Sequence, residues 1–321
     1  MNGGASPSTA APTVCAVILT YNRQALLRRC LVCLLEQTRP PDLILVVDNA
    51  SSDGTAEMLA REYPDVRALL LSPNVGAAGG FTAGMAQAYS AGYDWLWLMD
   101  DDAYPRPAAL ELLLAAGADA DLAADVLVPA QWSAQQNRLY GVAEWQPRGV
   151  VEAGPAALGP GHDVQLFAFV GPLISRAVIG RVGLPYAEYF IDMFDWEYSL
   201  RVQQAGLRAR LVPGSVIDHE AGEMKPQRLL GVGRVKPRFW RPGWRMYYDT
   251  RNTLLTIRRR RMGWPTVLRH LAAQPRAALR ELALEPDGLG RARLRWWAVR
   301  DGLRGVAGER ADVRQSGGAK R

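Results

Sequence analysis

Short apolar runs alternate with amphipathic stretches along the first third of the chain. Four runs are rich in β-branched or aromatic side chains, at residues 14–21, 43–48, 66–72 and 94–100. Such runs are typical of buried parallel strands. Residues 24–36 and 55–63 between them have helical spacing, and residues 74–85 form a glycine-rich turn that leads into a helix. This alternation predicts an α/β fold with a doubly wound, mostly parallel sheet flanked by helices.

Polar side chains follow the predicted strands at their carboxyl ends. They are Tyr21, Asn22, Asp48, Asn49, Asn74, Asp100, Asp101 and Asp102. In doubly wound sheets, ligands bind beyond the carboxyl ends of the strands. We therefore expect a ligand site along this edge of the sheet.

The three consecutive aspartates are the sharpest feature of that edge. Adjacent carboxylates repel one another, and Mg²⁺ or Mn²⁺ would relieve the repulsion while also binding phosphate oxygens. In an extended segment, Asp100 and Asp102 point to the same side. The alternative is a solvated turn or a helix cap before Pro107. His219 follows another predicted strand, at residues 209–217, and is either a further metal ligand or a structural histidine.

Asp48 and the glycine segment each have two interpretations. Asp48 could accept hydrogen bonds from a nucleotide base or ribose, or it could cap its own turn. Asn74, Gly79 and Gly80 would allow close approach of a ligand to the backbone, or they could form only a tight turn between strand and helix. The segment matches neither the GxGxxG nor the GxxxxGK[ST] phosphate loop.

A second acidic cluster interrupts the apolar and aromatic residues 190–201. A partly buried carboxylate has a raised proton affinity, which suits a general base. Asp192, Asp195 and Glu197 are the candidates. The same residues could also mark a helix start, with Asp195 as the cap and Glu197 in the first turn.

Charge is divided unevenly along the chain. The formal net charge is +6, but residues 225–321 contain 24 Lys and Arg against 7 Asp and Glu, a net of +17. Residues 1–224 therefore carry a net of −11. The basic part interleaves arginines with aromatic residues such as Trp240 and Trp244, which suits an anionic membrane surface or a polyprenyl diphosphate. The alternative is a solvated basic face. No recognisable nucleic-acid module accompanies the charge, so we expect no nucleic-acid partner.

The same basic part contains two local predictions. Glycine and proline after residue 223 suggest a mobile loop that closes over the ligand site. Residues 294–303 suggest an amphipathic helix. We divide the chain into a disordered lead-in (1–12), a catalytic domain (13–225) and a basic helical region (226–321).

Composition narrows the cellular setting. The chain has 321 residues, of which 49% are hydrophobic and 22% charged, and this excludes disorder across the whole chain. The three cysteines form no metal-binding set with histidine, and so low a number suits a reducing cytosol. No apolar run reaches the roughly 18–20 residues that span a bilayer. We expect a cytoplasmic protein that is peripheral at the inner face of the cell membrane.

Taken together and in this order, the motifs resemble those of the inverting family 2 glycosyltransferases, which have the GT-A fold. The matching segments are the opening strand with TYNR at residues 20–23, then VVDNASSDGT, NVGAAGGFTAGM, WLWLMDDDA, FVGPLISRAVIGRVGLP and FIDMFDWEYSLR, then His219. The resemblance covers about residues 13–260 and is strongest to the galactofuranosyl- and rhamnosyltransferase branch. Residues 247–252 look like a helix that follows the catalytic domain in that branch. Ala77 and Ala78 inside the glycine segment depart mildly from that branch.

The resemblance implies donor contacts around the strand ends. Asp48 would contact a uracil or thymine base, while Asn74 and the backbone near Gly79 and Gly80 would lie against the ribose and diphosphate. The remaining donor-binding residues would be Thr20, Tyr21, Arg23, Asp100 and Asp101.

It also implies the reacting groups. Asp102, His219 and Asp100 would hold Mn²⁺ or Mg²⁺, with Asp102 as the expected direct ligand. Asp195 would be the catalytic base. We expect the acceptor side to contain Asp192, Trp196, Glu197 and Trp244.

The function that follows is metal-dependent, inverting transfer of a sugar from a UDP- or dTDP-sugar to a lipid-linked or cell-surface glycan. Galactofuranose and rhamnose are favoured only because of the family branch. Two alternatives stay open: a nucleotidyltransferase or sugar-nucleotide pyrophosphorylase, and an inactive protein that binds nucleotide sugars.

Overall fold

Strand β1 (Val14–Thr20) is buried along its whole length at the centre of the first half of the sheet. It pairs in parallel with β2 (Leu43–Asp48) and β4 (Trp95–Asp100), and β2 pairs in parallel with β3 (Arg67–Leu70). The computed structural model describes residues 11–119, 121, 124–146, 149–152, 159, 161–219, 224–229, 232–285 and 287–316. The predicted lead-in therefore lies outside the described residues, apart from Ala11 and Pro12.

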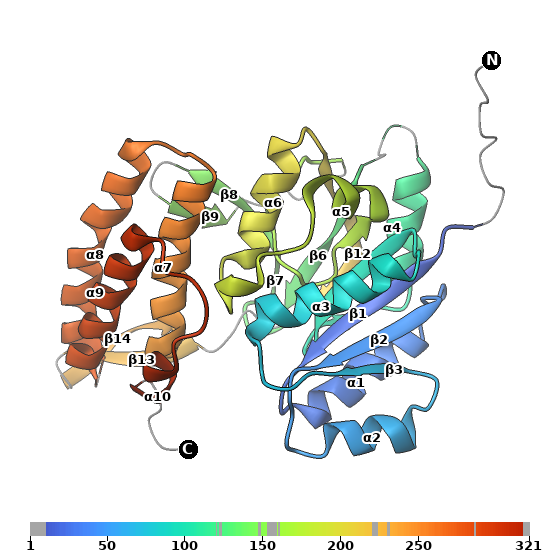
Figure 1. Ribbon diagram of the computed structural model, residues 1–321, viewed down its shortest axis with the longest axis horizontal. Coiled ribbons are helices and arrows are strands. Elements are labelled where there is room, and N and C mark those ends of the chain that lie inside the picture. Colours follow the sequence, from blue (N-terminus) through green and yellow to red (C-terminus); the bar gives the residue numbers. More distant parts are fainter. Residues whose placement is uncertain are drawn as a thin grey trace.

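The pleat of β1 divides the core into two layers. Cys15, Val17 and Leu19 face one apolar cluster, and the alternate side chains face the other. Helix α3 (Gly76–Ser90) covers the first face. Helices α1 (Gln24–Leu35), α2 (Thr55–Glu62) and α4 (Ala109–Ala118) cover the second (Figure 1). The predicted strands and helices of this half are confirmed to within a few residues at each end.

Beyond β4 the sheet becomes mixed. Its strand order is β3-β2-β1-β4-β11-β6-β12-β5, and β7 pairs with β6. The additional strands are β5 (Tyr104–Pro105), β6 (Val126–Ser133), β7 (Arg138–Tyr140), β11 (Leu173–Ser175) and β12 (Ala209–Asp218). β12 runs parallel to β6, whereas β11 is antiparallel to both of its neighbours. The short β11 leads directly into α5 (Arg176–Val182), and η2 (Ala187–Tyr189) and α6 (Phe194–Gln204) follow.

Part of the segment predicted as a glycine-rich turn is helical, because α3 already begins at Gly76. Gly79 and Gly80 lie within its first two turns. A Cβ at Gly80 would overlap the Leu19 side chain, so the missing side chain lets α3 pack closely on β1.

A small sheet borders the larger one. It has the order β10-β8-β9 and is formed by β8 (Val142–Gln146), β9 (Gly149–Glu152) and β10 (Leu166–Phe167).

The mobile loop predicted after residue 223 is instead an antiparallel pair where the structure describes it. Strands β13 (Met224–Leu229) and β14 (Val232–Phe239) pair with register shifts on either side of Gln227. Proline has no N–H to donate to a strand ladder, so it is tolerated where the ladder is already interrupted. Pro226 lies at the first of these shifts. The boundary predicted after residue 225 falls inside β13, and the division into two regions stays a prediction.

Four helices follow the hairpin and lie beside the sheet (Figure 1). They are α7 (Gly243–Arg259), α8 (Trp264–Leu284), α9 (Gly288–Arg304) and α10 (Ala311–Ser316). The two helical predictions of this part, at 247–252 and 294–303, lie in α7 and α9. Tyr247, Tyr248 and Leu294 form an apolar cluster with Phe190, which precedes α6. α7 thus packs against the segment that leads into α6. Within the described ranges, no helix is both long and apolar enough to span a membrane.

Candidate functional site

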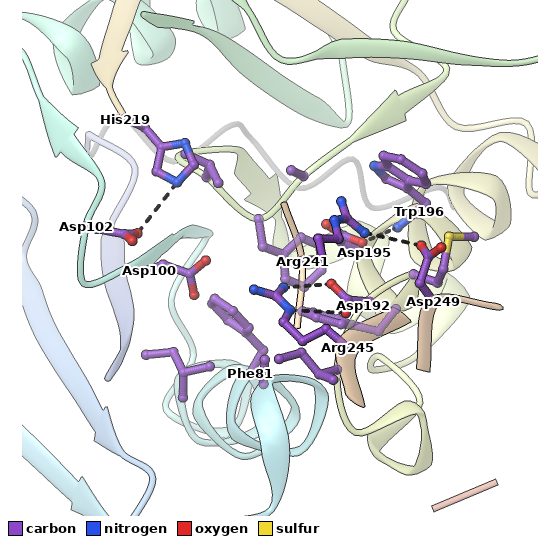
Figure 2. A pocket seen from close by; sticks show the side chains of 18 of the residues that line it. Phe81, Asp100, Asp102, Asp192, Asp195, Trp196, His219, Arg241, Arg245 and Asp249 are labelled. Carbon is purple, nitrogen blue, oxygen red and sulfur yellow. Dashed lines mark hydrogen bonds and ion pairs between the residues drawn. The ribbon is translucent and has the colours of Figure 1, made fainter. Parts of the chain in front are cut away.

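A cavity of about 1240 Å³ opens at the predicted edge of the sheet. It lies where β1 and β4 end, where α3 and α6 begin, and beside the first turns of α7 (Figure 2). Twelve of the predicted site residues line it: Thr20, Tyr21, Arg23, Asn74, Asp100, Asp101, Asp102, Asp192, Asp195, Trp196, His219 and Trp244. These side chains come from elements as far apart in the chain as Thr20 and Trp244, so the fold gathers most of the predicted set in one place.

The three aspartates after β4 have different surroundings. Asp101 is buried, and its carboxylate accepts hydrogen bonds from Thr20 Oγ1 at 2.7 Å and Arg23 Nη1 at 3.2 Å. Burial raises the pKa of Asp101 to about 6, although Arg23 and Thr20 oppose the shift. Burial and the neighbouring Asp102 and Asp101 raise the pKa of Asp100 well above its ordinary value. One arginine therefore offsets only part of the charge that three carboxylates concentrate here.

Asp102 and His219 lie next to each other on one wall of the cavity (Figure 2). His219 Nε2 lies 3.6 Å from Asp102 Oδ1, and Arg23 Nη1 donates to Asp102 Oδ2 at 2.8 Å. Burial raises the pKa of Asp102, but the hydrogen bond and charge of His219 and the charge of Arg23 outweigh it and leave this pKa below its ordinary value. Among the described residues, His219 and Asp102 are the two predicted metal ligands that an ion pair joins, while Asp100 interacts with Asp102 through charge.

The orientation of the His219 ring bears on whether a cation fits. The Tyr140 hydroxyl donates to the backbone oxygen of His219 at 3.0 Å and lies 2.5 Å from Nδ1. When Nδ1 donates to the Tyr140 oxygen, the neutral ring leaves a lone pair on Nε2, and a cation bound between Nε2 and Asp102 would replace the hydrogen bond that joins them. No group of three or more His, Cys, Asp and Glu side chains suited to a metal occurs in the described part of the chain. The residues present fit a divalent cation through two protein ligands, with phosphate oxygens and water as the others.

Asp195 lies on the opposite wall, in the first turn of α6 (Figure 2). Its Oδ1 accepts a hydrogen bond from the Trp196 backbone N–H at 2.8 Å. Burial raises the pKa of Asp195 to about 7, and the charge of Asp192 adds to the shift. Near neutral pH this carboxyl group can therefore accept a proton or release one, as a general base must.

The segment before α6 has a strained backbone. Phe190, Asp192 and Met193 all have positive φ, at 65°, 58° and 67°. Non-glycine residues seldom adopt this conformation, and such strain gathers at functional sites. Both carboxylate oxygens of Asp192 are held by Arg245, whose Nε and Nη2 lie 3.2 Å and 2.7 Å away. The strain and the ion pair together fix the direction from which α6 starts.

Three charged cavity residues of the C-terminal part are not among the predicted site residues. Arg241, Arg245 and Asp249 all line the cavity. Arg241 Nη1 lies 3.4 Å from Asp249 Oδ1, and burial raises the pKa of Asp249. The interleaved arginines and aromatics were the available signal, and they predicted a membrane surface or a polyprenyl diphosphate as the partner without assigning these residues to the site.

Four predicted site residues do not line the cavity. Asp48 is buried and caps its turn by accepting from the Ser51 N–H at 2.9 Å, which was the alternative interpretation. Gly79 and Gly80 lie inside α3, as described above. Glu197 is completely buried between Arg201, at 3.0 Å, and Arg260, at 3.2 Å, so its expected place on the acceptor side is wrong.

Asn49 replaces Asp48 in the cavity wall. Its side chain accepts from the Val75 N–H at 2.9 Å and donates to the Gly76 oxygen at 3.1 Å. Asn49 thereby ties the end of β2 to the start of α3. Asn49 is one of the polar residues that follow the predicted strands, but no site role was expected for it.

Comparisons with known proteins identify what the chain is similar to. The family model described as glycosyl transferase family 2 matches residues 15–158. Galactofuranosyltransferase GlfT1 of Mycobacterium tuberculosis is 32% identical over 226 residues, which are 67% of this chain and 73% of that protein. A 40% identical match to GlfT1 of Mycolicibacterium smegmatis covers only 29% of this chain and 30% of that protein.

Two rhamnosyltransferases are also similar. The N-acetylglucosaminyl-diphospho-decaprenol L-rhamnosyltransferase of M. tuberculosis is 27% identical, over 64% of this chain and 75% of that protein. The dTDP-rhamnosyl transferase RfbF of Shigella flexneri is 23% identical, over 91% of this chain and 96% of that protein. The second match extends into the C-terminal helices.

Solved structures confirm the predicted GT-A fold. The crystal structure of GalNAc-T7 with UDP, GalNAc and Mn²⁺ has a TM-score of 0.57 at 14% identity, covering 78% of this chain. This chain spans about half, 48%, of the GalNAc-T7 chain. Staphylococcus aureus TarS 1–349 in complex with UDP has a TM-score of 0.54 at 12% identity, covering 91% of this chain and 72% of that one.

Proposed function

This chain belongs to glycosyltransferase family 2, and on that premise we propose that it transfers galactofuranose or rhamnose, with inversion, from a UDP- or dTDP-sugar. The acceptor is a glycan, either linked to a polyprenyl diphosphate or growing at the cell surface. One observation carries the proposal: Asp195 and the Asp102–His219 pair face the same cavity from opposite walls (Figure 2). A sugar bound between them would have a base on one side and its leaving group on the other.

The donor lies along the strand ends in this proposal. Thr20, Tyr21, Arg23 and Asn74 line that wall of the cavity, with the three aspartates beside them. The positively charged guanidinium of Arg23 lies near the diphosphate in this arrangement. Asp48 supports the base-binding region through its capped turn.

Asp102 and His219 would hold the divalent cation, Mn²⁺ or Mg²⁺. When bound, the ion neutralises the charge that develops on the departing diphosphate. Tyr140 keeps the His219 ring in the orientation that exposes Nε2. Asp100 lines the same wall of the cavity and adds a carboxyl group to it.

Asp195 takes the proton from the acceptor hydroxyl. The hydroxyl oxygen attacks the anomeric carbon from the face opposite the leaving group, so the configuration inverts. Asp192 is a poorer base, because Arg245 engages both of its oxygens. Family membership and an intact carboxylate set favour this reaction over the nucleotidyltransferase and inactive-protein alternatives.

The acceptor enters beside α6 and α7, where Trp196 and Trp244 offer aromatic faces to a sugar. Arg241 and Arg245 line the same region and suit a diphosphate-linked acceptor. One relative is named for a decaprenol-linked substrate, which supports this class. We propose a peripheral association with the inner face of the cell membrane, a catalytic region at residues 13–225 and a basic extension at 226–321.

Donor and acceptor assays test the function. Purified protein would be incubated with UDP-galactofuranose or dTDP-rhamnose, a synthetic polyprenyl-diphosphate glycan, and Mn²⁺ with or without EDTA. We expect transfer that needs the metal, and a product whose anomeric configuration by NMR is opposite to that of the donor. Retention of configuration, or equal turnover in EDTA, would overturn the proposed mechanism.

A further inference from the structure

Helix α8 lies at the outer edge of the molecule (Figure 1), and it presents an apolar stripe to solvent. Trp264 is 74% exposed, Leu268 61% and Leu279 66%. At helical spacing these residues share one face with Ala272 and Pro275, both also exposed. Buried large side chains need no explanation, but a contiguous row of exposed ones marks an interaction surface.

Apolar exposure is concentrated in this part of the chain. Among the described residues, the five most exposed large apolar side chains all lie on α8 and α9. On α9 they are Leu289, at 81%, and Trp296, at 69%. Scattered single exposures are normal, so their concentration on two helices is the informative feature.

The charges beside the stripe all have one sign. Arg269, Arg276 and Arg280 are exposed and form a row next to the apolar one. Glu281, the one acidic residue of α8, is buried and bonded to Arg295 of α9 at 2.5 Å. The inward face of α8 is therefore neutralised by its own partner helix, while the outward face is positive.

We propose that this face of α8 lies in the plane of an anionic lipid bilayer, with Trp264, Leu268 and Leu279 among the acyl chains and the arginines at the headgroups. An amphipathic helix with an aromatic residue and a cationic flank has the chemistry of an interfacial helix. The inference rests on the proposed function, since a polyprenyl-linked acceptor resides in a membrane.

A second copy of the chain fits this surface less well. In a two-fold symmetric contact, the same patch meets itself. The three arginines of one copy would then approach the three of the other, which opposes association. An anionic lipid surface instead pairs each arginine with a phosphate.

The position of α8 also suits the proposed acceptor route. α7 contributes Trp244, Arg245 and Asp249 to the cavity wall, and a short turn at residues 260–263 joins it to α8. Binding of α8 to a bilayer would hold α7, and with it the acceptor side of the cavity, close to the membrane surface.

Vesicle flotation of the full chain tests the proposal, using phosphatidylcholine vesicles with or without phosphatidylglycerol. We expect binding that requires phosphatidylglycerol and weakens with salt. One triple variant changes Trp264, Leu268 and Leu279 to Ser, and another changes the three arginines to Gln. Each should weaken binding at least about tenfold, because each basic or buried apolar group near the surface contributes about a factor of five or more. The matched control, Leu35→Ser with Leu70→Ser, removes exposed apolar side chains elsewhere and should bind as the parent does.

Further readouts separate the possible failures. Circular dichroism melting and UDP binding by calorimetry should match the parent in both triple variants, because α8 does not line the cavity. A parent that transfers sugar to a water-soluble acceptor but does not bind vesicles would overturn this inference and leave the proposed function standing. Vesicle binding without any transfer would overturn the function alone. A dimer by light scattering that the Ser variant dissociates would assign the stripe to a second copy and also overturn the inference.

Discussion

The side-chain amide of Asn252 donates to the backbone oxygen of Ile191 at 2.8 Å, so a buried residue of α7 holds the segment that leads into Asp195. The same amide lies 2.9 Å from the oxygen of Tyr189 and 3.0 Å from that of Asp192. This segment contains backbone at positive φ, and it would relax without such anchors. The C-terminal helices thus position the acidic cluster that precedes them in the sequence.

Replacing Asn252 with Ala should lower kcat by about 10- to 100-fold, because small displacements of a reacting group cost that much. UDP affinity should change little, since the strand ends are untouched. Thr253→Ala is the matched control: it removes a hydrogen bond that lies only within α7. Steady-state kinetics and calorimetry give the two values, and unchanged kcat in Asn252→Ala would contradict a positioning role.

Asp195→Asn should lower kcat by about a thousandfold, within the usual range for loss of a general base. The amide keeps the size of the side chain, so the UDP dissociation constant should stay within a few fold. Asp192→Asn is the comparison, with a smaller loss expected because that residue is paired with Arg245. The base assignment is reversed if the two variants exchange these results.

The rate should rise with pH. Since burial raises the pKa of Asp195 to about 7, more of the carboxyl group is ionised as pH increases through that value. We expect kcat/KM to increase from pH 5.5 and level off above about pH 8. The measurement needs a donor for which the chemical step limits the rate. With such a donor, a value of kcat/KM that stays constant across neutral pH would refute a base with this pKa.

Stability should respond to the same group in the opposite direction. The pKa of Asp195 in the folded chain lies above its ordinary value of 3.8, so between about pH 4 and 7 the folded state binds this proton more tightly than the unfolded state. The contribution of Asp195 to stability therefore falls as pH rises through this window. Asp195→Asn removes the effect, and its melting temperature relative to the parent should increase from pH 5 to pH 8. Calorimetric melting of both proteins at pH 5 and pH 8 measures this difference. A difference in melting temperature that is the same at both pH values would count against the raised pKa of Asp195.

Metal affinity should depend on Tyr140 as well as on the two proposed ligands. Asp102→Asn and His219→Ala should each weaken Mn²⁺ binding in the presence of UDP by at least about tenfold, and Tyr140→Phe by about 10- to 100-fold through loss of the His219 hydrogen bond. His162→Ala is the control. Titration followed by electron paramagnetic resonance reports bound Mn²⁺ without turnover. Parent-like affinity in all three variants would place the ion elsewhere.

Gly76→Ala should destabilise the chain more than Gly92→Ala. Both glycines have positive φ, 75° and 93°, and so both variants carry backbone strain of about 1–2 kcal/mol. A Cβ at Gly76 also overlaps the backbone oxygen and ring of Phe190, whereas Gly92 has open space around it. The extra loss in melting temperature should be at least about 4 °C. Equal melting temperatures would mean that the Phe190 segment moves aside freely.

Several features follow from local sequence alone. The apolar runs at 14–21 and 43–48 predict strands because a β-branched run of that length suits a buried strand, and β1 and β2 form there. Asp102 and His219 both follow strands, and the rule that ligands bind beyond strand ends places both at the cavity. These predictions succeed because they depend on periodicity and on a general property of α/β sheets.

Other features depend on which distant elements come together. Glu197 and Asp195 are two residues apart on one helix, yet Asp195 faces the cavity while Glu197 turns inward to Arg260, which directly follows α7. Their spacing predicts that they lie on opposite sides of the helix, but which side faces the cavity depends on what α6 packs against. Arg245 and Asp249 join the cavity for the same reason: α7 returns to the segment before α6 across more than fifty residues.

The sequence by itself thus determined the α/β core, the carboxylates at its edge and the charge of the C-terminal part, since each depends only on short-range spacing and composition. Only the tertiary structure decided which carboxylate is exposed to the cavity, which arginines pair with it and which helix face stays uncovered. These outcomes arise from packing between elements far apart in the chain, where burial and partner charges change the chemistry of otherwise identical side chains.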